Sequence, residues 1–240
     1  MVFSNTTDRT GIIELLEDLT NTQSATTSSY PLKTKTRDIN NAYADYFRIS
    51  TDSSGTWQGD DTNQVDYPVI TTNIVSGQQD YSFTTDEQGN QILDIYRVEC
   101  KDANGVWQLL ASYDENTETT SLSSQELLTG TPTRYYKTAN GIFLDRKPSY
   151  NSTGGLKIYY ARTPAYFVST DTTKKPGFPD VFHTYLAFRP AYMYCVAKGL
   201  QQANAYRIEL DRLELSIKTY YSMRTRDEKP RLTVKQESNR

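Results

Sequence analysis

The spacing of apolar side chains changes twice along the chain. Before residue 55 and again after residue 178, apolar residues recur every three or four positions, which is typical of helices packed on one face. Between residues 65 and 162 the period falls to two, as where Tyr81 and Phe83 alternate with polar neighbours. The pattern therefore predicts helices, then strands, then helices.

The central stretch carries the turn signals of a strand-rich module. Asn140-Gly141 lies between two short apolar runs and predicts a two-stranded hairpin. The Asp-Ala-Asn-Gly run at residues 102–105 predicts a second turn. With roughly six to eight short strands at this spacing, we expect an antiparallel β-sandwich or β-barrel over residues 64–165.

Helices are predicted on both sides of this module. Residues 1–55 are expected to form two helices, the second beginning near Thr36, and residues 178–225 two long helices. In the first long helix, Phe182, Leu186 and Met193 share one apolar face. In the last, from about Ala203 to Arg224, the packed stripe steps by four and three residues through Tyr206, Leu210, Leu213, Ile217 and Tyr220. The predicted fold class is α+β: a helical bundle from both chain ends, with the antiparallel β module inserted between its halves.

Ile208 and Leu215 fall on the opposite face of the last helix when residues are placed 100° apart. Isolated apolar residues are common on protein surfaces, so the pair is open to that interpretation. The alternative is a second packing partner such as a neighbouring subunit. On the second interpretation, Ile208 and Leu215 are the candidate subunit-interface residues.

The last residues, 226–240, form a separate segment. Pro230 prevents a helix there, and Leu232 and Val234 alternate with Arg231 and Lys235. Two interpretations are open: a disordered tail, and an extended segment that adds as an edge strand to a partner.

Charge and composition narrow the function classes. The 240 residues carry 26 basic and 29 acidic side chains, a net charge of −3. We therefore do not expect the protein as a whole to bind nucleic acid electrostatically. The 19 tyrosines, each with an apolar ring and a polar hydroxyl, are suited to contact surfaces that are partly exposed to water. No apolar run is long enough for a membrane span, and a secretory signal is not expected.

Residues for catalysis or metal binding are scarce. His183 is the single histidine, and neither a nucleophile elbow, a phosphate-binding loop nor a zinc motif is present. Cys100 and Cys195 lie in apolar surroundings and are expected to be buried and inert. Trp107 is expected to pack within the sheet, and Trp57 lies in a polar loop. We therefore predict no catalytic, cofactor or metal site, and no enzyme activity.

Several loose patterns recur in one order along the chain. They are the Arg37–Tyr43 helix start, Ser76–Phe83, Gly130–Tyr136, Gly141–Pro148, Leu156–Tyr160, and Pro179–His183 followed by two long helices. In order and spacing, residues 30 to 225 resemble the head-to-tail adaptor proteins of tailed bacteriophages, the tail tubular or gatekeeper-type ring proteins below the portal.

The resemblance implies a structural protein of the virion neck, made in the host cytoplasm. Its copies would form a ring, usually dodecameric, that joins the portal protein to the tail or the next neck protein. Genomic DNA would pass through the lumen without specific binding, and no cofactor or membrane is implied. Because the family's C-terminal extension often reaches into the portal, the portal-docking candidates are Arg226, Lys229, Arg231, Leu232, Val234 and Lys235.

Two other functions are weighed against this one. A monomeric β-sandwich module that binds a glycan or a host surface would use Trp57 or exposed tyrosines, but it leaves the long helices unexplained. A cell-wall hydrolase would need two carboxylates that converge, and almost any chain with 29 acidic residues offers some such pair.

Overall fold

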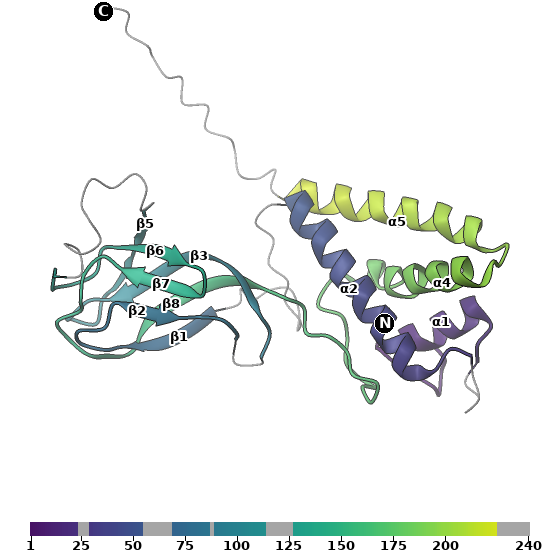
Figure 1. The fold of residues 1–240 in the computed structure, drawn as a ribbon, viewed down its shortest axis with the longest axis horizontal. Helices are drawn as coiled ribbons and strands as arrows, with labels where there is room; N and C mark the ends of the chain where they lie inside the picture. The colour runs from purple at the N-terminus through teal and green to yellow at the C-terminus, as the bar shows by residue number, and fades with distance from the viewer. Residues whose placement is uncertain (24–28, 55–68, 87–88, 114–126, 225–240) are drawn as a thin grey trace, which may run out of the picture. The chain divides into compact units, whose positions relative to one another are not determined.

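The chain forms two compact units. The strand unit comprises Met1–Gly11 and Gln58–His183, and the helical unit comprises Ile12–Trp57 and Thr184–Arg240. Met1–Gly11 falls with the strands, as Phe3 stacks on Phe167 at 4.5 Å between ring centroids. The computed structural model (Figure 1) describes residues 1–23, 29–54, 69–86, 89–113 and 127–224.

Within the described residues, the strand unit contains eight strands in two four-stranded sheets. The first sheet has the order β1-β8-β3-β4, and the second has the order β2-β7-β6-β5 (Figure 1). Together with the helices, they confirm the predicted α+β class. The strands are β1 (Val69–Ile74), β2 (Asp80–Ser82), β3 (Ile92–Lys101), β4 (Trp107–Leu109), β5 (Ala111–Ser112), β6 (Arg134–Thr138), β7 (Gly141–Leu144) and β8 (Ser152–Arg162).

Both predicted turns join antiparallel neighbours. Thr138 pairs with Gly141 in the β6–β7 hairpin, and Lys101 pairs with Trp107 across the turn between β3 and β4. Gly141 is also required by close packing, because a side chain there would collide with the carbonyl oxygen of Tyr81 on β2. The short strand β5 departs from the antiparallel prediction, since it runs parallel to β6.

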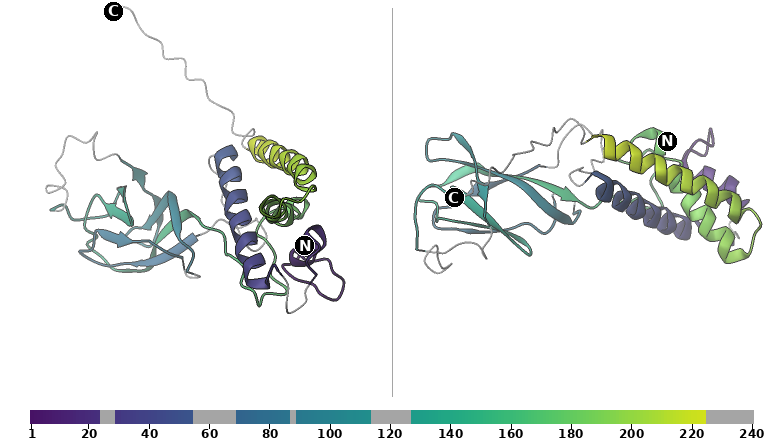
Figure 2. Two further views of the ribbon diagram at one scale, coloured as in Figure 1. Left: turned by 45° about the vertical axis from the view of Figure 1, so that its right-hand side comes forward. Right: turned by 90° about the horizontal axis from the view of Figure 1, so that it is seen from above.

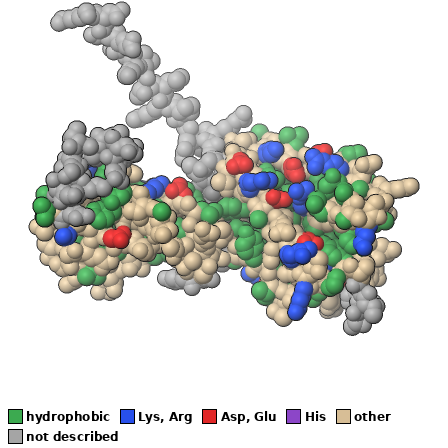
Figure 3. Space-filling model, in the orientation of Figure 1, with side chains coloured by type: hydrophobic (Ala, Val, Ile, Leu, Met, Phe, Trp, Pro, Cys, Tyr) green, Lys and Arg blue, Asp and Glu red, His purple; other side chains and the backbone are tan. Residues whose placement is uncertain are grey.

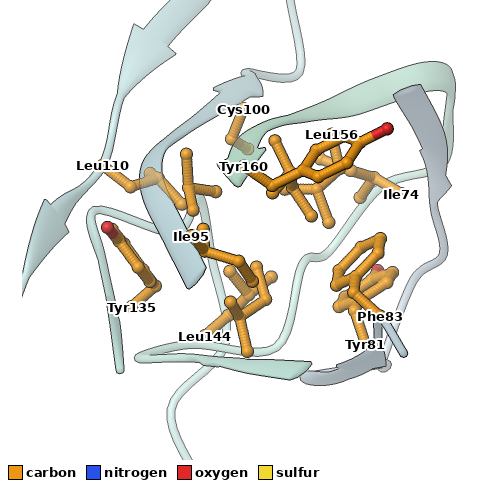
Figure 4. Close-up of a cluster of buried hydrophobic side chains, with 13 residues drawn as sticks. Ile74, Tyr81, Phe83, Ile95, Cys100, Leu110, Tyr135, Leu144, Leu156 and Tyr160 are labelled. Atoms are coloured by element: carbon orange, nitrogen blue, oxygen red, sulfur yellow. The ribbon is translucent and has the colours of Figure 1, made fainter. Parts of the chain in front are cut away.

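The inner faces of the two sheets share one hydrophobic core. Strand alternation places Val98 and Cys100 of β3 on the inner face, and a register shift between Ile95 and Arg97 brings Ile95 to the same face. Figure 4 shows Ile95, Leu110, Tyr135 and Leu144 directed into this interior from both sheets. The other buried members are Ile74, Tyr81, Phe83, Ile142, Leu156, Ile158 and Tyr160.

The helical unit joins helices from both ends of the chain. Contacts link α1 with α4, and α2, α4 and α5 with one another; Figure 2 shows the last three side by side. Their bounds are α1 (Ile12–Thr20), α2 (Leu32–Ser54), α4 (Tyr185–Lys198) and α5 (Ala203–Arg224).

Two predicted helix starts are wrong. Helix α2 begins at Leu32 instead of near Thr36, because the carbonyl of Pro31 accepts hydrogen bonds from the amides of Thr34 and Lys35. Helix α4 begins at Tyr185, after a short 3₁₀ turn over Asp180–Phe182.

The predicted apolar face of the first long helix is also wrong. Phe182 and Leu186 are buried, but Met193 is 54% exposed. Phe182 belongs to the preceding turn, so the face cannot be extrapolated from it through α4. The side chains that α4 buries are Tyr185, Leu186, Ala187, Pro190, Ala191 and Cys195.

A buried ion pair ties α1 to α2. Lys35 Nζ donates to Glu17 Oε1 at 2.9 Å and to the carbonyl oxygen of Thr22 at 3.0 Å. The two side chains are only 2% and 7% exposed. Removing Lys35 takes away an ammonium contact that Glu17 makes in a buried setting, and this loss costs far more than the loss of an exposed pair.

We expect Lys35→Met alone to lower the free energy of unfolding by about 3 kcal/mol, because the buried Glu17 loses the ammonium group that donates to it. The double variant Lys35→Met/Glu17→Leu should recover much of this loss. Urea denaturation followed by circular dichroism measures both. The exposed Arg212–Glu209 pair is the control, and Arg212→Met should leave the midpoint unchanged. A Lys35→Met protein as stable as the parent would contradict the prediction.

Candidate functional site

Helix α5 buries one stripe of side chains against the helical unit. Leu210, Ile217 and Tyr221 are each fully buried, and the hydroxyls of Tyr221 and Tyr46 on α2 form a hydrogen bond of 2.9 Å. The predicted stripe ended on Tyr220, which is instead 39% exposed. The error follows from helix geometry, because a straight α-helix has 3.6 residues per turn and brings Tyr221 above Ile217.

The opposite side of α5 carries the two candidate interface residues. Ile208 is 72% exposed and Leu215 is 67% exposed. Seven residues apart, they lie within about 20° of one another around the helix and point away from the buried stripe. Helix α5 therefore presents apolar side chains on both of its sides.

Ion pairs flank this outer face of α5, defined by Ile208 and Leu215. Arg207 pairs with Asp211 at 2.9 Å, and Arg212 pairs with Glu209 three positions away. On the side of the helical unit drawn in Figure 3, hydrophobic, cationic and acidic side chains are interspersed. An apolar centre with a charged rim of both signs is the usual composition of a protein–protein contact.

A second, different surface lies between α2 and α4. There a groove of about 440 Å³ is bordered by the stacked rings of Tyr30 and Tyr194, whose centroids are 4.7 Å apart. Asp45 and Arg189 form an ion pair of 3.2 Å at its wall. The rest of the lining is Ser29, Thr34, Asp38, Asn41, Ala42, Pro190, Met193, Ala197 and Lys198.

His183 is buried, with both ring nitrogens in hydrogen bonds. Nε2 lies 2.8 Å from the carbonyl oxygen of Phe178, and Nδ1 lies 2.7 Å from the amino nitrogen of Met1. Burial lowers the pKa of His183, and the bond to Phe178 opposes that shift only in part. These contacts give the ring a structural role in the strand unit.

The two thiols are buried in separate units. Cys100 lies in the sheet core and Cys195 on α4, and burial raises the pKa of each thiol. Both therefore stay in the poorly reactive thiol form at neutral pH. Within the described ranges, no three His, Cys, Asp or Glu side chains lie close enough to hold a metal ion.

The prediction that Trp107 packs within the sheet is wrong. Trp107 pairs with Lys101 on β3, and that position faces outward, so the indole lies outside the core and is 37% exposed. Ammonium groups cover it instead: Lys157 Nζ lies 4.2 Å and Lys101 Nζ 4.9 Å from the ring centroid. The sequence of the strand alone did not identify this face, because Lys157 is distant in sequence and Lys101 meets the indole only through the pairing of β3 with β4.

The remaining sequence candidates lie outside the described residues. These are Trp57 and the portal-docking candidates Arg226, Lys229, Arg231, Leu232, Val234 and Lys235. In the part of the chain that is described, no helix is both long and apolar enough to cross a membrane.

The family model described as SU10 adaptor protein matches residues 11–231 of the chain. The match runs through segments of both units and contains the outer face of α5. No curated protein matches the chain closely enough to count as a relative.

We predict that acid weakens the fold partly through His183. Its folded pKa lies below the ordinary 6.5, so the unfolded chain takes up a proton at a higher pH than the folded chain does. The free energy of unfolding therefore falls as the pH drops below about 6.5. His183→Gln, whose amide still donates to Phe178, should show a smaller loss between about pH 7.5 and pH 5.5 in urea titrations. Equal losses in the two proteins would refute this role.

Proposed function

The chain belongs to the SU10 adaptor protein family, and from that premise we propose that its copies form a ring joining the portal to the tail. The family is one of structural bacteriophage proteins and not of enzymes, so the chain is an adaptor of the virion neck. The ring, which we expect to be dodecameric, would continue the channel through which genomic DNA leaves the capsid.

The outer face of α5 is the observation that carries the proposal. A closed ring of identical subunits needs two different surfaces on each copy, one fitting the other head to tail. The helical unit offers two such surfaces: Ile208 and Leu215 on α5, and the α2–α4 groove bordered by Tyr30 and Tyr194. We assign the first to contact with the next copy in the ring.

The charge of the chain fits passage of DNA. A net charge of −3 gives each copy a weak repulsion toward phosphate, and a lumen that does not attract phosphate lets the duplex slide. DNA is therefore a passing cargo and not a bound ligand.

We assign docking on the portal to residues 226–240. Their five basic and three acidic side chains give the segment a net charge of +2, and Leu232 and Val234 supply alternating apolar contacts. One such segment binds weakly, but a ring presents many at once, so the combined attachment is strong.

The ring interface is tested by Ile208→Glu/Leu215→Glu. A carboxylate at either position must lose its water when the neighbour packs on it, so ring formation should be lost. Native mass spectrometry and negative-stain imaging, with and without portal protein as a template, measure this. Val181→Glu is the matched control, since Val181 is 72% exposed like Ile208 but belongs to the strand unit. Intact rings from the double variant would exclude this face as the interface.

Portal docking is tested by deleting residues 225–240. The truncated protein should keep its thermal unfolding temperature but bind portal at least about tenfold more weakly, because many repeated contacts are lost together. Co-sedimentation with portal at rising salt concentration gives the affinity. Leu232→Asp/Val234→Asp in the full chain separates the apolar contacts from the charges. Unchanged attachment of the truncated protein would contradict the assignment.

A further inference from the structure

The outer face of the first sheet carries a cluster of charged and aromatic side chains. From Arg97 onward the residues of β3 alternate: Val98 and Cys100 are buried, and Arg97, Glu99 and Lys101 point outward. Strand pairing brings Arg97 opposite Tyr159, Glu99 opposite Lys157 and Leu109, and Lys101 opposite Trp107. We call this set the cationic sheet face: Arg97, Glu99, Lys101, Trp107, Leu109, Lys157 and Tyr159.

The cationic sheet face carries an excess of positive charge. Glu99 is its single acid, and it already pairs with Arg97 at 2.6 Å and with Lys157 at 3.8 Å. Three cations against one carboxylate leave a net charge of +2 on a small area. Such a face favours an acidic partner over a neutral one.

Trp107 restricts the chemistry of that partner. The ammonium groups of Lys101 and Lys157 lie 4.9 and 4.2 Å from its ring centroid, within the range of cation–π attraction. Because the two lysine ammonium groups lie over the indole of Trp107, the ring is not free to stack against a base or a sugar. Each ammonium has three donors, so carboxylates can still bind from the solvent side. The face therefore suits an acidic peptide better than a nucleic acid.

The neighbouring strand edge suits an extended peptide. Strand β4 is at the edge of the sheet and pairs on one side only, with β3. The amide of Asp102 donates to the carbonyl oxygen of Val106, and the amide of Leu110 donates to the carbonyl oxygen of Val98. In an antiparallel ladder, the backbone groups of the intervening Trp107 and Leu109 then point away from β3. A peptide added as a further strand could form main-chain hydrogen bonds with these groups. The side chain of Leu109, which is 59% exposed, lies beside them.

The chain itself contains a segment of the complementary charge. Residues 114–126 include Asp114, Glu115, Glu118 and Glu126 and no basic residue, a net charge of −4. One flank is held on the second sheet, where Tyr113 N donates to the carbonyl of Tyr135, and the other forms an isolated bridge from Thr129 to Lys147, three residues after β7. The acidic segment is thus anchored on one sheet, while the cationic sheet face is the outer side of the other.

We propose that the acidic segment 114–126 of one copy binds the cationic sheet face of the next copy. The inference rests on the proposed ring, in which strand units of neighbouring copies come together. It adds an electrostatic contact between strand units to the apolar contact of α5. The position of each copy against the next would then be set by two interfaces, one electrostatic and sensitive to salt and the other apolar.

A synthetic peptide of residues 113–127 tests the contact without a ring. The receiving protein is the full chain with Trp57→Phe, so that Trp107 is the only tryptophan, and with Ile208→Glu/Leu215→Glu to keep it monomeric. Its own segment is neutralised by Asp114→Asn, Glu115→Gln, Glu118→Gln and Glu126→Gln, which leaves the face open. We expect a saturable change in Trp107 fluorescence at low salt that weakens as salt shortens the range of the attraction.

Matched variants locate the binding. Lys101→Gln/Lys157→Gln should weaken peptide affinity by about fivefold, the loss expected for two partly exposed ion pairs. Lys137→Gln, which removes an exposed cation elsewhere in the strand unit, should leave affinity unchanged. A peptide with its four acids replaced by Asn and Gln should not bind. Equal binding of the neutral peptide, no binding at low salt, or a duplex DNA oligonucleotide that binds this face in place of the peptide would each overturn the inference.

Charge exchange separates this contact from the ring itself. Lys101→Glu/Lys157→Glu should prevent rings, as should Asp114→Lys/Glu115→Lys/Glu118→Lys, whereas a chain with both changes should recover them. Unfolding temperatures, measured in parallel, show that each variant is folded. If every variant forms rings like the parent, the inference fails and the ring proposal stands. If the parent forms no ring even on the portal, the ring proposal fails and the peptide result alone decides the inference.

A further measurement distinguishes binding of the acidic segment to a neighbouring copy from binding to the face of its own chain. The monomeric protein with its native segment is titrated with the same peptide. If the contact forms between copies, this protein binds the peptide as well as the neutralised one does. If peptide binds only after the chain's own acids are neutralised, the segment occupies its own face and the contact between copies is wrong.

Discussion

The packing of α5 on α2 and α4 is the constraint on which the proposed subunit interface depends. The buried hydroxyl pair of Tyr46 and Tyr221 and the fully buried Leu210 and Ile217 fix how α5 is rotated about its axis. A helix is rigid at about 100° per residue, so fixing one stripe fixes every other side chain. Ile208 and Leu215 are exposed as a direct consequence, and no local sequence change can bury them without turning the whole helix.

The same rule, with a period of two, organises the strand unit. Because Val98 and Cys100 must enter the core, Arg97, Glu99 and Lys101 must leave it. Inward side chains supply the burial that stabilises the unit, and outward ones are available for recognition. Stability and assembly thus draw on different residues of the same elements, so interface variants need not unfold the protein.

The two proposed contacts differ in their physics. An apolar contact at Ile208 and Leu215 gains from removal of surface from water and depends little on salt. A contact between the acidic segment and the cationic sheet face is screened beyond about 8 Å at physiological salt, so it acts mainly by orienting copies as they meet. Each is weak alone. In the proposed ring many such contacts would act together, so a neck could assemble from copies that bind one another with modest affinity.

Local patterns were enough to predict much of this protein. The period of apolar residues predicted an α+β chain and the limits of α5, and the Asn140-Gly141 turn signal predicted the β6–β7 hairpin, since each depends on neighbours a few residues away. It also identified Ile208 and Leu215 as opposite the packed stripe of α5. The order of motifs pointed to the adaptor family that the match over residues 11–231 establishes.

What only the tertiary structure decided concerns which side of an element meets a neighbour. The exposure of Met193 follows from how α4 packs on α2 and α5. The outward position of Trp107 depends on its register with β3, and its contact with Lys157 on the pairing of β3 with β8. Sequence period says which residues share a face. Only contacts between segments far apart in the chain say what that face meets, because burial is a property of the packed chain and not of any one segment.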